Sequence, residues 1–193
     1  MPIMQVYYAA EALEAPTKAD LARRLTEVLI RMEGGANTRE GRAFAWVMFS
    51  QLAHDDWWVG GSAAEGSNPP PGRFLVAVTI PEGYMNKAQK NDVHGWVAES
   101  ILASTGVPRT PECGAGILVV IHEVTEGNWS AAGSPLSLEG IANSVGLSRQ
   151  SERFAWSRRY FEAKARWLAG AGFPDDMGGV LPSQTKARQI AQN

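Results

Sequence analysis

The chain has 193 residues, of which 45% are hydrophobic and 20% charged, and its net charge at pH 7 is -2. This composition supports a folded core and excludes a disordered, collagen-like or globally basic nucleic-acid-binding protein. Because no apolar run is long enough to span a membrane and the start does not resemble a secretory signal, we expect a cytoplasmic protein without a membrane partner. One cysteine and three scattered histidines predict no disulfide, no metal and no cofactor.

An internal repeat organises most of the chain. A shift of 72 residues aligns positions 2–61 with 74–133 without a gap, and 11 of the 60 pairs are identical, against about four expected by chance. We therefore predict repeat one at 2–61, a turn-rich linker at 62–72 and repeat two at 73–133.

The first repeat has the pattern strand, helix, strand. An apolar run at 2–8 predicts a buried strand. The next segment starts with residues typical of a capping box at 16–20, and its apolar side chains follow at steps of three and four: Leu21, Leu25, Val28, Leu29 and Met32. Gly34 stands where this helix should end, and residues 43–49 are typical of a second strand.

The second repeat has the same pattern. Residues 74–80 predict a strand, a helical stripe runs from Val93 to Leu102, Gly106 ends the helix, and 117–124 predict the last strand. The fold class is therefore α/β: two tandem β-α-β units form a four-stranded sheet with two helices on one face. The other face stays apolar, which predicts a closed oligomer.

A helical extension follows this predicted domain of residues 1–140. Residues 141–193 contain a helix candidate at 148–169 and carry much of the basic charge. Four arginines, Arg149, Arg153, Arg158 and Arg159, would contact phosphates if the segment bound DNA. We favour an amphipathic helix that packs its aromatic side chains on a neighbouring subunit, with no nucleic-acid partner, since the whole chain is acidic.

The start of the chain and the end of repeat two resemble the tautomerase superfamily. Met1-Pro2-Ile3 opens a short strand of a β-α-β unit, and repeat two ends with residues 122–133, His-Glu-Val-Thr-Glu-Gly-Asn-Trp-Ser-Ala-Ala-Gly. The small members of that family resemble 4-oxalocrotonate tautomerase. The doubled unit with an extension is similar to the fused members, including cis-3-chloroacrylic acid dehalogenase and malonate semialdehyde decarboxylase. The resemblance covers residues 2–140 and implies a homotrimer that acts on a small molecule.

Pro2 is the predicted catalytic residue. Removal of Met1 would leave a free secondary amine, whose pKa of about 7.7–8.0 in water falls when the group is buried. Such an amine is a general base near neutral pH. If Met1 stays, the nitrogen of Pro2 is an amide without basicity and this chemistry is lost.

The arginines that the family uses to bind the substrate carboxylate are absent at the matching positions. Those positions hold Ala12 and Tyr84 after the first strand of each copy, and Trp46 and Leu118 in the second strands. The helix histidine of the dehalogenase-like members is matched by Leu29, which disfavours hydrolytic dehalogenation.

Other side chains can take the place of these arginines. We predict a substrate-binding set in which Arg73, favoured because pseudo-symmetry could set it beside Pro2, and Arg42 supply the cation. Tyr8, Trp57 and Trp129 would form the walls of the pocket, and the family resemblance implies an aromatic side chain at the position of Trp129.

The sequence thus predicts a tautomerase-like isomerase that moves a proton between carbon and oxygen of a small oxo or enol acid. A related proline-dependent decarboxylase or hydratase, an inactive oligomeric scaffold and a DNA-contacting protein remain as alternatives. The substrate itself is not predicted.

Overall fold

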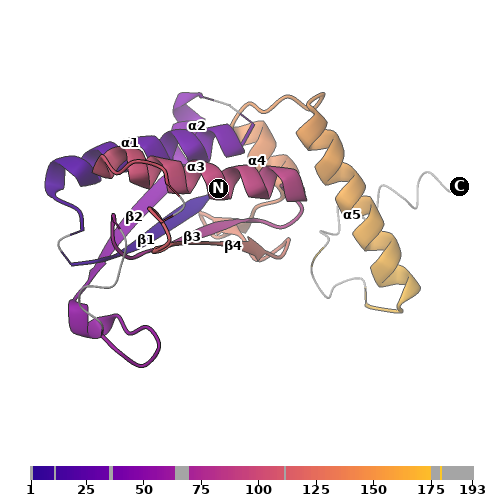
Figure 1. Cartoon of the computed structure of the whole chain (residues 1–193). Helices are drawn as coiled ribbons and strands as arrows, with labels where there is room; N and C mark the ends of the chain where they lie inside the picture. Colours follow the sequence, from indigo (N-terminus) through magenta and orange to yellow (C-terminus); the bar gives the residue numbers. More distant parts are fainter. Residues whose placement is uncertain are drawn as a thin grey trace, which may run out of the picture.

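The computed structural model describes residues 2–10, 12–34, 37–63, 70–110, 112–174 and 179. The fold class is the predicted one, with a four-stranded sheet in the order β2-β1-β3-β4 and two long helices on one of its faces (Figure 1). The strands are β1 (Ile3–Ala9), β2 (Trp46–Leu52), β3 (Phe74–Pro81) and β4 (Ile117–Val124), with the short pair β5 (Ser130–Ala131) and β6 (Ser134–Pro135). The helices are α1 (Ala15–Met32), α2 (Arg39–Ala43), the one-turn η1 (His54–Asp56), α3 (Lys87–Thr105), α4 (Leu138–Ser144) and α5 (Glu152–Gly170).

Each repeat forms one parallel strand pair, and the two pairs meet in antiparallel register. β1 is parallel to β2 and β3 is parallel to β4, while Ile3 pairs with Thr79 and Tyr8 with Phe74 across the centre of the sheet. The sheet therefore has two unlike ends. We call the end where β1 and β2 begin and β3 and β4 finish the Pro2 end, and the opposite end the Phe74 end.

The core lies between the sheet and the helix pair. Alternate side chains of β1 point to the helices, so that Met4, Val6 and Tyr8 are buried. The predicted apolar stripes of α1 and α3 are both buried against this face, and the two helices contact one another. The opposite face leaves large apolar side chains in water, as Trp46 is 50% exposed and Leu118 is 60% exposed.

Two local expectations were wrong. The second strand begins at Trp46 rather than at residue 43, because residues 39–43 form α2, whose first turn is capped by the Thr38 side chain accepting from the Gly41 amide at 2.9 Å. The capping box also lies elsewhere. Glu14 precedes α1 without a side-chain cap, whereas Asn86 and Gln89 form a reciprocal box at the start of α3.

The extension packs on its own chain. Phe161 is buried in the main core and Tyr160 and Leu168 pack against that core, whereas we expected the aromatic residues of this helix on a neighbouring subunit. α5 stands beyond one end of the sheet, opposite the end near η1 (Figure 1). Among the described residues, no helix is both long and apolar enough to cross a membrane.

Two glycines of the Pro2 end provide room for the extension. Both have positive φ: a Cβ at Gly83 would overlap the Tyr160 ring, and one at Gly34 would lie 2.7 Å from Cδ1 of Leu147. Gly106, the repeat partner of Gly34, has φ of 69° and would place its Cβ in open space. The extension thus covers one end of a duplicated fold and leaves the other uncovered.

Gly83→Ala should destabilise the protein more than Gly106→Ala. Both residues have φ near 70°, so both substitutions carry the left-handed backbone penalty of about 1–2 kcal/mol. Only Gly83→Ala also displaces a packed ring, which adds about 1–3 kcal/mol. Urea unfolding of the two variants measures the difference, and equal losses of unfolding free energy would contradict the packing described.

Candidate active site

Pro2 is buried at the start of β1. Its carbonyl accepts a hydrogen bond of 3.5 Å from the Trp46 amide, which ties it to the first residue of β2. Pro2 is therefore enclosed by the protein.

The two turns nearest to this end of the sheet are joined by a tyrosine. Glu33 ends α1 and Tyr84 follows β3, and both are buried. The Tyr84 hydroxyl donates to the backbone carbonyl of Glu33 at 2.8 Å. Burial raises the pKa of the Tyr84 hydroxyl, so it stays a hydrogen-bond donor at neutral pH.

The pKa of the Glu33 carboxyl is also shifted. Burial raises the pKa of its carboxyl, and the neighbouring positive charge of Arg153 opposes part of this rise. The raised pKa increases the share of neutral carboxylic acid at this position near neutral pH.

Hydrogen bonds and an ion pair with Glu82 hold α5 at the Pro2 end. The Glu82 carboxylate accepts from the Tyr160 hydroxyl at 2.6 Å and from the Lys164 ammonium at 2.6 Å to each oxygen. Burial alone would raise the pKa of Glu82, but Lys164 and Tyr160 hold it below the ordinary value. The pair is only 14% exposed on each side, so it is screened less than a surface ion pair.

A second buried carboxyl supports the start of α4. Oε1 of Glu126 accepts from the Leu138 amide at 3.2 Å, and the Glu126 amide donates to Glu82 at 3.4 Å. Burial raises the pKa of Glu126, and the nearby charge of Glu82 raises it further. Glu82 and Glu126 thus link both helices of the extension to the turns after β3 and β4.

Two of the predicted substrate-binding residues lie at the Pro2 end. Trp129 follows β4 and is buried. Arg42 precedes β2, but its guanidinium is bound to Glu27 and to Asn37, each at 2.8 Å. Arg42 is therefore already occupied by partners of its own chain.

The other three predicted residues lie at the Phe74 end. Arg73 is buried and its Nη1 donates to the Trp57 carbonyl at 2.9 Å, while Tyr8 stacks on Phe74 inside the core. Since Tyr8 and Pro2 are six residues apart on one strand, about 20 Å separates this group from Pro2 within one chain. Arg73 and Trp57 instead line a cavity of about 560 Å³ beside Trp58.

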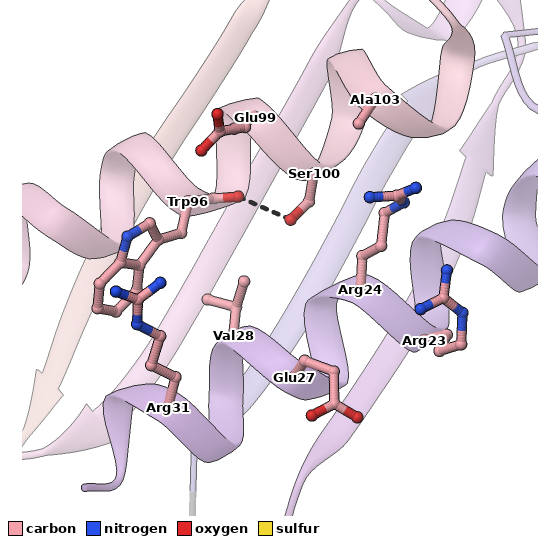
Figure 2. Close-up of a pocket in the computed structure, with 9 residues that line it drawn as sticks. All are labelled: Arg23, Arg24, Glu27, Val28, Arg31, Trp96, Glu99, Ser100 and Ala103. Atoms are coloured by element: carbon pink, nitrogen blue, oxygen red, sulfur yellow. Dashed lines mark hydrogen bonds between the residues drawn. The ribbon is translucent and has the colours of Figure 1, made fainter. Parts of the chain in front are cut away.

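A groove of about 350 Å³ also runs between α1 and α3 (Figure 2). The Arg31 guanidinium lies 3.9 Å from the centre of the Trp96 ring, and Figure 2 shows it stacked over the indole. Arg24 and Arg23 bind Asp20 and lower its pKa to about 2. Other charges of this groove are also paired with side chains outside its lining, since Glu27 binds Arg42 and Glu99 binds Arg109. None of the predicted site residues lines the groove.

Sequence reasoning missed three residues of the Pro2 end. They are Glu33, Tyr84 and Arg153, whose guanidinium lies 5.3 Å from the centre of the Tyr84 ring. The signals were weak: an acid directly after an apolar helix stripe, and one arginine within a basic segment. Within the described residues, no three His, Cys, Asp or Glu side chains are grouped so that they could hold a metal ion.

Solved structures of tautomerase-related proteins share this fold. A wild-type fused 4-OT, described as a symmetric trimer, is 18% identical, covers 72% of this chain and 98% of its own, and has a TM-score of 0.55. A member of the cis-3-chloroacrylic acid dehalogenase family is 18% identical over 72% of this chain and 87% of its own, with a TM-score of 0.57. A malonate semialdehyde decarboxylase inhibited by 3-bromopropiolate is 16% identical over 68% of this chain and 91% of its own, with a TM-score of 0.51.

These similarities show the fold, and about a quarter of this chain lies outside them. No protein-family model and no curated protein sequence matches the chain. The two-repeat fold predicted from the sequence is therefore confirmed by its structural neighbours.

Glu126→Gln should change how stability depends on pH. Because burial raises the pKa of Glu126, the folded protein binds this proton more tightly than the unfolded chain, and stability falls as pH rises between the two values. Glutamine keeps the acceptor for Leu138 and cannot ionise. The variant should therefore unfold at higher urea concentration than the parent at pH 8, and the gain should shrink by pH 4. A pH-independent difference would contradict the buried-acid assignment.

Proposed function

We propose that the chain is an enzyme of the tautomerase superfamily in which Pro2, freed by removal of Met1, is the general base. The burial of Pro2 at the start of β1 carries this proposal, because a desolvated secondary amine is uncharged at neutral pH more often than an exposed one. The shared fold with a fused 4-OT supports it. Phe74 occupies the matching place in repeat two, so each chain would have one active site.

The proposed reaction is a keto-enol isomerisation of a small oxo or enol acid. The Pro2 nitrogen accepts a proton from the enol hydroxyl through its lone pair, and the electrons of that O–H bond form the π bond of the carbonyl. The C=C π electrons of the enol form the new C–H bond as prolinium returns the proton to carbon, and the Pro2 amine is regenerated. Atoms and charge balance without a cofactor or a second substrate. Decarboxylation or hydration by the same base would break a different bond of the substrate. Both remain alternatives, because the proteins that share this fold include a dehalogenase-family member and a decarboxylase.

Pro2→Ala tests the base directly. Intact-mass measurement first establishes that Met1 is removed from both proteins, and ketonisation of phenylpyruvate or 2-hydroxymuconate then gives the rates. A positioned general base contributes about 10²–10⁴-fold, so kcat/KM should fall by about that factor while the melting temperature stays within a few degrees. A form that keeps one residue before Pro2 should be as inactive as the variant. Equal rates for the parent and either altered protein would overturn the proposal.

We further infer that the active protein is a homotrimer assembled through the open face of the sheet. Trp46, Met48 and Leu118 are exposed there, and burial of such a face stabilises an assembly. A fused 4-OT with this fold is described as a symmetric trimer.

Leu118→Lys should dissociate this trimer. Light scattering after gel filtration should give three times the chain mass for the parent and the mass of one chain for the variant, because a buried unpaired ammonium disfavours association. Trp167→Lys is the matched control, since Trp167 is 65% exposed on α5 rather than on the sheet. A parent that is monomeric, or a control that dissociates equally, would contradict the assignment.

A further inference from the structure

The groove between α1 and α3 has two unlike walls. The α1 wall carries Arg24 and Arg31 with Val28 between them, and the α3 wall carries Trp96 and Ala103. Figure 2 shows Trp96 at the Arg31 end of the groove and Ala103 at the Arg24 end. Most of the lining side chains are exposed or half-buried, so a partner can reach the groove from solvent.

The internal repeat allows the two walls to be compared position by position. The shift of 72 residues pairs Arg24 with Trp96 and Arg31 with Ala103. Equivalent places on the two helices therefore hold a cation on α1 and an uncharged side chain on α3. A ligand that contacts both walls would bind this groove in one orientation.

Positive charge exceeds negative charge around the groove. The two acids of its lining each contact an arginine outside it. Arg23 and Arg24 share the single carboxylate of Asp20. In the described part of the chain, the Arg31 guanidinium is held by the Trp96 ring rather than by a carboxylate. The groove is therefore complementary in charge to an acidic partner.

Both arginines at the ends of the groove can bind a further carboxylate. Arg24 contacts Asp20 through Nε at 2.6 Å, which leaves its terminal nitrogens as donors. Arg31 lies with its guanidinium 3.9 Å from the centre of the Trp96 ring, and such a stack leaves the N–H groups at its edge as donors. A guanidinium edge binds a carboxylate through two parallel hydrogen bonds.

The floor of the groove between these arginines is suited to an apolar side chain. Val28 is only 7% exposed there. The Ser100 hydroxyl donates to the Trp96 carbonyl at 2.7 Å (Figure 2), so its donor is already satisfied within α3. A partner that fits the groove therefore has an acidic group at each end and an apolar group between them.

The spacing of the arginines indicates a helical partner. Arg24 and Arg31 are seven residues apart on α1, so their Cα atoms are separated by about 10.5 Å. Two acids seven residues apart on another helix have the same spacing and share one face. In an extended strand, side chains of one face are about 7 or 13 Å apart, which matches less well.

We propose that the groove between α1 and α3 is a docking site for an acidic amphipathic helix of a partner protein. Arg24 and Arg31 bind two carboxylates that lie seven residues apart on that helix, and an apolar side chain midway between them packs on Val28 and Trp96. This surface is formed by the two helices of the repeats and does not depend on the chemistry of Pro2.

A designed helical peptide is the probe. It has about 16 residues of an alanine- and glutamine-rich host, with two glutamates seven positions apart and a leucine midway between them. Fluorescence anisotropy of the labelled peptide with the full-length protein gives the affinity. A peptide with glutamine in place of both glutamates should bind at least about tenfold more weakly, and so should a peptide of equal charge whose glutamates are four positions apart.

Variants of the two arginines test which side chains bind the probe. Arg24→Gln and Arg31→Gln should each weaken binding of the first peptide about tenfold, as expected for loss of a charged hydrogen bond. Arg158→Gln removes the same charge from a side chain of α5 that is 70% exposed, and it should bind the peptide as the parent does. The melting temperatures of all three variants should stay within a few degrees of the parent.

The place of binding is measured by NMR of the protein labelled with ¹⁵N-tryptophan, in which Trp96→Phe identifies the Trp96 indole signal. That signal should shift when the first peptide is added. Equal affinity of the parent for the three peptides, or no binding at about 1 mM peptide, would overturn the proposal. Full binding by Arg24→Gln and Arg31→Gln, equal loss in Arg158→Gln, or an unchanged Trp96 signal would overturn it as well.

Discussion

The ion pair between Lys164 and Glu82 holds α5 across the Pro2 end of the sheet, and the character of the site depends on it. Both partners are mostly buried, and the Tyr160 hydroxyl adds a third hydrogen bond to the same carboxylate. Removing either partner would leave an unpaired buried charge, so breaking this ion pair costs a large free energy. With α5 in place, Arg153 is fixed against Tyr84 and the turn at Gly34.

A duplicated fold gives two similar ends, and the extension makes them different. At the Pro2 end, glycines with positive φ admit Leu147 and Tyr160, whereas the equivalent Gly106 is open. The Phe74 end has no proline at the start of its strand and keeps a cavity lined by Trp57 and Arg73. One end thus combines a buried proline directly before β1 with a covering helix, while the other has neither.

The fold was predictable because its signals repeat. Apolar residues recur at steps of three and four in α1 and α3 and form continuous runs in β1, β3 and β4, because all of these elements are buried against one shared core. The repeat shows these helix and strand patterns twice. The sequence pattern placed the start of β2 too early, because Ala43 belongs to the short helix α2. That helix is capped by a hydrogen bond from the Gly41 amide to the Thr38 side chain, and a pattern of apolar residues does not reveal such a bond.

The site was less predictable because it forms between segments far apart in sequence. Pro2 could be named from chemistry, but Glu33, Tyr84 and Arg153 come together only when α1, β3 and α5 meet. Arg73 was favoured on pseudo-symmetry, and the antiparallel pairing of β1 with β3 puts it at the opposite end of the same chain.

The most direct test is an NMR titration of the protein labelled with ¹⁵N-proline, after mass analysis has established that Met1 is gone. A buried amine at the start of β1 should lose its proton below the ordinary α-amino pKa of about 7.7, and its nitrogen shift should follow that single step. A pKa above 8, or a Pro2 nitrogen that does not titrate because a residue still precedes it, would contradict a proline base.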